Sequence, residues 1–124
     1  FGLKKGALAS YIAHDSHNIV AVGASDEDIF AAIKEIEGLR GGLVAVADGE
    51  VLASLALPVA GLLSDESLEV VVEKLGKLEQ VATHLGTTLS SSFSTLSFVA
   101  LQVIPELRLA VLGLVDVDQF RLLD

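Results

Sequence analysis

The sequence predicts an α+β domain, in which a mostly antiparallel or mixed sheet is packed with two main helices. Three observations support this fold class. Short segments rich in Ala, Val and Ile favour strands, an Asp48-Gly49 turn separates two of them, and two longer segments carry apolar residues at helical spacing. A length of 124 residues suits one modest core, so residues 1–124 are expected to form a single domain.

The first two expected strands span residues 6–13 and 18–24, joined by a polar run whose turn-forming residues favour a hairpin-like connection. A helix is expected after Ser25, where a hydroxyl cap precedes three carboxylates, so this acidic cluster indicates a helix terminus rather than a metal site. Gly38 is expected to end this helix. Its apolar stripe consists of Ile29, Phe30, Ile33 and Ile36.

Two further strands are expected at residues 43–47 and 51–57, with apolar residues that suggest cover on both faces. The intervening Asp48-Gly49 suits a type I′ turn, and Pro58 ends the second strand because it cannot donate a ladder hydrogen bond. Residues 58–63 then form a loop of small and apolar residues that would suit packing against another domain.

A second helix is expected from a Ser64 cap to about Leu85, with Gly86 just past its end. Its predicted buried side consists of Leu68, Val71, Val72, Leu75, Leu78, Ala82 and Leu85. Its predicted solvent side consists of Glu69, Glu73, Lys74, Lys77 and Glu79.

The rest of the chain is expected to hold a hydroxyl-rich loop, a short helix and two late strands. The loop spans residues 87–94, the helix lies within residues 93–103, and the strands span residues 107–112 and 120–123. Between these strands, Asp116 and Asp118 would share a face of an extended segment and could pair as acid and base. A solvated turn is the favoured interpretation, because no other ligand or base lies nearby in the sequence.

Composition excludes several classes of function. A net charge of −9 with only eight scattered basic residues argues against nucleic-acid binding, and no apolar run approaches the roughly 20 residues of a membrane helix. The absence of cysteine removes disulfides and thiolate metal sites, and no secretion leader is seen, so a cytoplasmic setting is expected. A start at Phe1 without any methionine suggests a piece of a longer protein.

The apolar content of 52% is high for a small domain that must cover its own surface. Two explanations are open. Either helices cover both faces of the sheet, or one apolar surface of the domain docks on a larger partner.

The polar run is the strongest functional signal. It consists of His14, Asp15, Ser16, His17 and Asn18, between two apolar segments. Turns seldom need two imidazoles, and a neutral imidazole can both donate and accept hydrogen bonds.

With its flanks at residues 2–10 and 19–23, this run resembles the start of the C-terminal domain of bacterial and archaeal adenine deaminases, which belong to the metal-dependent amidohydrolase superfamily. The resemblance continues along nearly the whole chain. It is carried by Gly41-Gly42-Leu43-Val44, Leu57-Pro58-Val59-Ala60-Gly61-Leu62, Ser64-Asp65-Glu66, Thr95-Leu96-Ser97-Phe98, Val103-Ile104-Pro105-Glu106-Leu107-Arg108-Leu109 and Gly113-Leu114-Val115-Asp116-Val117-Asp118.

The resemblance implies a parent enzyme that converts adenine and water to hypoxanthine and ammonia. Its manganese or iron would lie in an upstream barrel domain, where it would lower the pKa of a bound water. The His-x-His metal motif of the superfamily is absent from this sequence, so no catalytic residue, metal ligand or cofactor is assigned to the chain. The implied role is accessory: the chain would be inactive alone, with the N-terminal barrel domain as partner and subunit association into a homo-oligomer.

Three interpretations of the polar run remain open. His14 and His17 could bind a metal with Asp15, but histidines three apart point to opposite sides of an extended strand, which disfavours such a site. Alternatively, Asp15, Ser16 and Asn18 fix the loop backbone while the imidazoles pack. The preferred interpretation comes from the resemblance, which places residues 14–18 near the barrel mouth as substrate-adjacent candidates.

A competing hypothesis from a different class is a free-standing module, related to the enzyme domain, that binds a purine or another protein. The sequence also departs from the family pattern. Gln102 stands where a proline is common, and Ala110-Val111-Leu112 replaces a more polar turn. These changes leave open a parent that acts on another purine or has lost activity.

Overall fold

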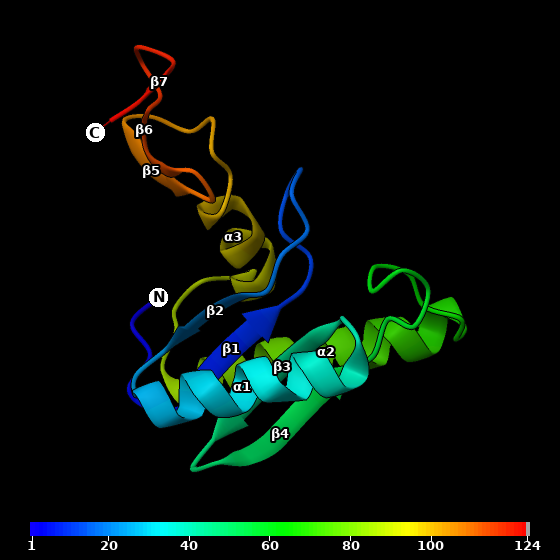
Figure 1. Cartoon of the computed structure of the whole chain (residues 1–124). Coiled ribbons are helices and arrows are strands. Elements are labelled where there is room, and N and C mark those ends of the chain that lie inside the picture. Colours follow the sequence, from blue (N-terminus) through cyan, green and yellow to red (C-terminus); the bar gives the residue numbers. More distant parts are fainter. Residues whose placement is uncertain (124) are drawn as a thin grey trace.

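The computed structural model describes residues 1–123, which form two antiparallel sheets and three helices (Figure 1). The helices are α1 (Asp26–Leu39), α2 (Leu68–Leu85) and α3 (Ser92–Val99). The strands are β1 (Ala7–Ser10), β2 (Val20–Gly23), β3 (Leu43–Ala47), β4 (Glu50–Leu55), β5 (Leu107–Ala110), β6 (Gly113–Asp116) and β7 (Arg121–Leu122). The main sheet has the order β2-β1-β3-β4, and the second sheet has the order β5-β6-β7. The predicted α+β class with an antiparallel sheet is confirmed.

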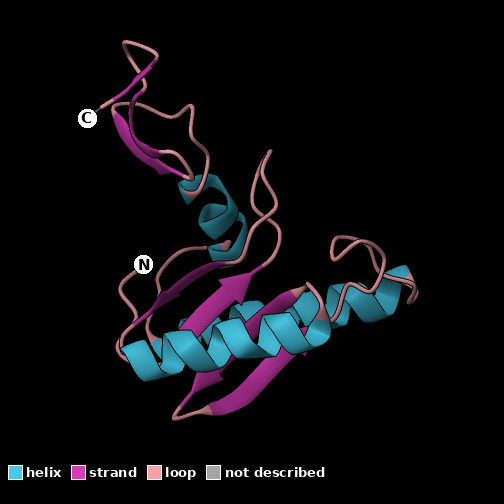
Figure 2. Cartoon of the chain, in the orientation of Figure 1, coloured by secondary structure: helices cyan, strands magenta, loops and turns pink. Residues whose placement is uncertain are grey.

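The main sheet lies between α1 and α2 (Figure 2). Successive strand residues point to opposite faces, so Ala7 and Ala9 pack toward α1 while Leu8 between them packs toward α2. The cluster under α1 contains Ala7, Ala9, Ala32, Ile36, Val44 and Val46. Small alanines on both surfaces let this helix approach the sheet closely.

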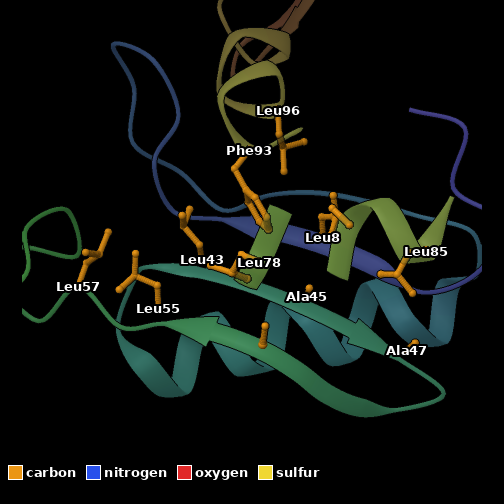
Figure 3. Packing of buried hydrophobic residues seen from close by; sticks show 12 residues of the cluster. Leu8, Leu43, Ala45, Ala47, Leu55, Leu57, Leu78, Leu85, Phe93 and Leu96 are labelled. Atoms are coloured by element: carbon orange, nitrogen blue, oxygen red, sulfur yellow. The ribbon is translucent and has the colours of Figure 1, made fainter. Parts of the chain in front are cut away.

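The larger core lies on the opposite face, where α2 and α3 both pack on the sheet (Figure 3). Leu8 is fully buried there beside Leu78 of α2 and Leu96 of α3. The cluster also contains Leu43, Ala45, Ala47, Ala53, Leu55, Leu57, Ala82, Leu85 and Phe93. Helices therefore cover both faces of the central strands, as one of the two explanations of the apolar composition requires.

The start of α1 is confirmed, but its predicted end is wrong. The Ser25 hydroxyl accepts a hydrogen bond from the Asp28 amide at 3.2 Å, as a cap should. The helix continues through Gly38 to Leu39, and Arg40 adopts the left-handed conformation that ends it, with φ 58°. Phe30 is 63% exposed and does not belong to the buried stripe, which is carried by Ala32 and Ile36.

The type I′ turn between β3 and β4 is confirmed, because Asp48 and Gly49 have φ of 53° and 75°. The Asp28 carboxylate accepts a hydrogen bond from the Gly49 amide at 3.0 Å, which ties the hairpin to α1. The sequence predicted that both faces of this strand pair would be covered, but this prediction is wrong for the start of β4. This strand forms the edge of the sheet, and its first residues, Glu50 to Leu52, are exposed.

The predicted start and the predicted buried side of α2 both need correction. Ser67 caps this helix, whereas the Ser64 hydroxyl accepts from the Glu66 amide in the preceding turn. Leu68, Val72 and Leu75 are exposed, since the first half of α2 extends beyond the sheet (Figure 1). Glu79, expected in solvent, is half-buried, and its carboxylate accepts from the Ser92 and Phe93 amides at the start of α3. None of the described helices has the length and apolarity needed to cross a membrane.

The C-terminal segment forms a hairpin that the sequence only partly predicted. The expected strand at residues 107–112 ends at Ala110, and β6 at residues 113–116 was missed. Asp116 accepts a hydrogen bond from the Gln119 amide at 2.9 Å, so the turn interpretation of Asp116 is confirmed. Residues 107–122, here called the arm, extend away from the main sheet (Figure 1).

Candidate functional site

The polar run lies on a loop, residues 11–19, that leaves the main sheet at the end of β1. The Ser10 hydroxyl accepts from the Ile12 amide at 2.9 Å and donates to the Ile12 carbonyl, which turns the chain out of the strand. The Tyr11 amide donates to the Gly42 carbonyl at 2.9 Å and fixes the base of the loop. Asp15 has φ 66°, a left-handed conformation that aspartate tolerates better than most residues.

His14 fastens the loop to α3. Its backbone amide donates to the Ser97 carbonyl at 3.1 Å. Its imidazole lies against the ring of Phe98, with the ring centroids 5.1 Å apart and the planes tilted by 33°. Two contacts of different kinds therefore hold one point of the loop, although the His14 side chain stays exposed.

A cavity of about 200 Å³ lies between the loop and the segment that follows α3. We call it the loop pocket. It is lined by His14, Asp15, Ser16, Leu101, Gln102 and Val103. A second cavity of about 230 Å³, the arm pocket, is lined by Gln102, Val103, Val115, Val117, Phe120, Arg121 and Leu122. The two cavities share Gln102 and Val103, so the loop and the arm border one continuous end of the domain.

Three of the five residues predicted from the sequence therefore come together. His14, Asp15 and Ser16 line the loop pocket, whereas His17 and Asn18 are exposed and line neither the loop pocket nor the arm pocket. Gln102, which lies close to Asp15 and Ser16, was noticed only as a departure from the family pattern. No periodicity or motif links its position to the loop, because the packing of α3 brings the two segments together.

The described part of the chain does not fit the metal that the resemblance implies. Within residues 1–123, no three His, Cys, Asp or Glu side chains are grouped so that they could hold an ion. In particular, His14 stacks on Phe98 instead of converging with His17 and Asp15. The loop offers hydrogen-bonding groups and one stacked imidazole.

The arm carries an apolar surface that the rest of the domain leaves uncovered. Its three short strands pair only with one another and form a single layer. Four of its side chains are exposed by 80% or more: Leu109, Val111, Leu112 and Phe120. A small single-layer sheet that leaves large apolar side chains exposed is marginally stable in water, so this surface is typical of a docking site.

Comparison with known proteins places these features in a family. The profile of the adenine deaminase C-terminal domain matches residues 1–121. The chain is 58% identical over 123 residues to an adenine deaminase of Dehalococcoides mccartyi strain 195 and 55% identical over 124 residues to one of Archaeoglobus fulgidus. It is also 57% identical over 120 residues to adenine deaminase 2 of Carboxydothermus hydrogenoformans.

These matches cover 99%, 100% and 96% of this chain, respectively. The chain itself spans only 21–22% of the length of these relatives. The resemblance inferred from the polar run and the motifs that follow it is thereby confirmed. The chain belongs to the adenine deaminase C-terminal domain family.

Proposed function

We propose that this chain is the accessory C-terminal domain of an adenine deaminase, and that it docks on the preceding part of the enzyme and completes its active site. The parent enzyme would convert adenine and water to hypoxanthine and ammonia in the purine metabolism of the cytoplasm. Manganese or iron, as the resemblance implies, would be held by the preceding barrel domain. Family membership supports this role, as does the small share of the relatives' length that the chain represents.

The observation that carries the proposal is that the uncovered arm and the polar loop lie at the same end of the domain (Figure 1). Docking of the arm would bury Leu109, Val111, Leu112 and Phe120 against the preceding part of the enzyme. The same contact would also place the polar loop against the preceding part of the enzyme, because the arm pocket and the loop pocket adjoin and share Gln102 and Val103.

A second apolar surface supports the proposal that the domain also contributes to association into a homo-oligomer. It consists of Val59, Leu63, Leu68, Val72 and Leu75, and it lies where the first half of α2 extends beyond the sheet. Residues 58–63 were predicted from the sequence as a segment suited to packing against another domain.

The chain alone is expected to release no ammonia from adenine. Its described residues offer no group that could hold a metal ion and activate water in the way that the resemblance implies. The measurement is an ammonia assay with adenine and added manganese or iron, with the metal alone as the blank. Turnover above that blank would contradict the accessory role.

In a full-length enzyme that carries this domain, His14→Ala and His17→Ala are expected to change the kcat or KM for adenine. Each change removes one imidazole from the loop that the proposal places beside the substrate. A fall in kcat/KM of about tenfold, the effect of one lost hydrogen bond or a loosened loop, is expected for at least one of them. His84→Ala, on the exposed end of α2, is the matched control. Unchanged kinetics in both loop variants would refute a substrate-adjacent loop.

A further inference from the structure

The start of α3 is capped by a side chain from another helix. Ser91 stands at the cap position, but its side chain forms no capping hydrogen bond. The Glu79 carboxylate of α2 takes this role: one oxygen accepts from the Ser92 amide at 3.0 Å, and the other accepts from the Phe93 amide at 3.3 Å. A helix of eight residues is marginal by itself, so the start of α3 depends on this carboxylate.

The end of α3 holds the polar loop, which lies beside the helix (Figure 1). The Ser97 carbonyl belongs to the last turn of α3, where carbonyls lack partners within the helix, and it accepts from the His14 amide at 3.1 Å. The ring of Phe98, on the same turn, contacts the His14 imidazole. A displacement of α3 would therefore displace the loop at His14.

Packing alone does not fix the position of α3. Phe93 and Leu96 are buried in the larger core and hold one side of the helix. A cavity of about 260 Å³ lies between α2, α3 and the base of the loop, and Glu79, Ser97 and Ile12 are among its lining residues. Close packing resists displacement, whereas an unfilled space does not. The two hydrogen bonds of Glu79 are therefore needed to fix the start of α3.

Both walls of the loop pocket depend on α3. One wall consists of residues 14–16, which are fastened to the helix at His14. The other wall consists of residues 101–103, which come shortly after the helix ends at Val99. A change in the position of α3 would thus alter the shape of the pocket from both sides.

Resting on the proposed function, we propose that Glu79 is a positioning residue for adenine deamination, which acts through α3 to hold the polar loop beside the substrate. The contacts run from the Glu79 carboxylate to the start of α3, along this helix to Ser97 and Phe98, and from there to His14. Glu79 does not touch the substrate in this arrangement. Its effect on the reaction depends wholly on the loop.

The test uses a full-length adenine deaminase that carries this domain, with Glu79→Ala and Glu79→Gln as variants. Alanine removes both acceptors, whereas glutamine keeps the length of the side chain and one acceptor oxygen, and it gives a second readout if the alanine variant fails to fold. Glu73→Ala, which removes an exposed carboxylate from the same helix, is the matched control. Gly49→Ala is a control for destabilisation, because it strains the β3–β4 turn without touching α3.

Amide hydrogen exchange and steady-state kinetics are measured for each protein. Glu79→Ala is expected to speed exchange about five- to tenfold in residues 92–99 and 11–19, the effect of a lost helix cap. It is expected to lower kcat/KM for adenine about three- to tenfold, with smaller changes for Glu79→Gln. Both controls should keep kcat/KM within about twofold of the parent. The assignment is overturned if exchange in residues 11–19 is unchanged, or if Gly49→Ala lowers kcat/KM as much as Glu79→Ala does.

A double variant tests whether Glu79 acts through the loop. Glu79→Ala is combined with His14→Ala or His17→Ala, whichever lowers kcat/KM more. The combined loss should be smaller than the product of the two single losses, because Glu79 then positions a loop that has already lost its most important imidazole. Single losses that multiply would mean that Glu79 acts independently of the loop, which overturns the assignment.

The same kinetics separate this inference from the proposed function. If a loop variant lowers kcat/KM while both Glu79 variants keep the parental value, the substrate-adjacent loop stands and the assignment of Glu79 fails. If neither the loop variants nor the Glu79 variants change kcat/KM, the role proposed for the loop fails, and the assignment of Glu79 fails with it.

Discussion

Replacement of Gly42 by alanine is expected to lower the free energy of unfolding of the domain by about 3 kcal/mol. Gly42 is buried with φ 99°, a conformation that an L residue adopts only under strain, and an added Cβ would overlap the carbonyl oxygen of Leu55. Relief of that overlap must move the end of β4 or the base of the loop, where Tyr11 donates to the Gly42 carbonyl. Urea denaturation followed by circular dichroism measures the loss.

Gly49→Ala is the matched control for Gly42→Ala. Gly49 also has a positive φ, 75°, but nothing lies within 4 Å of an added Cβ. It should therefore cost only the backbone strain, about 1 kcal/mol. Equal losses in the two variants would show that the close approach of the chain to Gly42 contributes nothing to stability.

The triple variant Leu109→Ser, Val111→Ser and Leu112→Ser is expected to lower kcat/KM for adenine about 10²-fold in the full-length enzyme. The three side chains are 80%, 85% and 82% exposed, respectively, so they stabilise little within the domain itself. Their proposed contribution is to docking, and displacement of the loop by even a small distance would misplace the groups around the substrate. Steady-state kinetics of ammonia release measure the effect.

Two controls confine that result to docking. In the isolated chain, each of the three substitutions should change the free energy of unfolding by no more than about 0.5 kcal/mol. Phe30→Ser in the full-length enzyme removes an apolar side chain of similar exposure, 63%, from α1 and should leave the kinetics unchanged. If the triple variant keeps parental activity, or if Phe30→Ser matches its loss, the arm is not the docking surface.

The elements predicted correctly from the sequence are those set by local chemistry. The Asp48-Gly49 turn and the Ser25 cap each follow from a few adjacent residues, and both are present as expected. Gly38 was expected to stop α1 because glycine often ends helices. The helix continues through it, and the chain reverses only at Arg40 and the two glycines that follow, which have positive φ.

The elements that were missed depend on what the chain packs against. Ser64 was predicted to cap the second helix, whereas the structure uses Ser67. The first half of α2 has the periodicity of a buried helix, yet it extends past the edge of the sheet and stays exposed. The strand at residues 113–116 was not predicted, because its hairpin turns at Val111-Leu112, which carry no turn signal.

In the candidate site too, the part set by local sequence could be predicted and the part set by packing could not. The polar loop could be identified from its composition, because two imidazoles and three other polar residues interrupt two apolar segments. Its counterpart across the pocket could not be identified, since Gln102 reaches the loop only through the packing of α3 on the sheet and the contact of His14 with Phe98.

The central claim is that the arm and the loop are buried against the preceding part of the enzyme. Amide hydrogen exchange, measured on the isolated chain and on the full-length protein, tests it most directly. A single-layer sheet should exchange rapidly when uncovered, so docking should slow exchange in residues 107–122 and 11–19 by about tenfold or more. Equal exchange of both segments in the two proteins would contradict the claim.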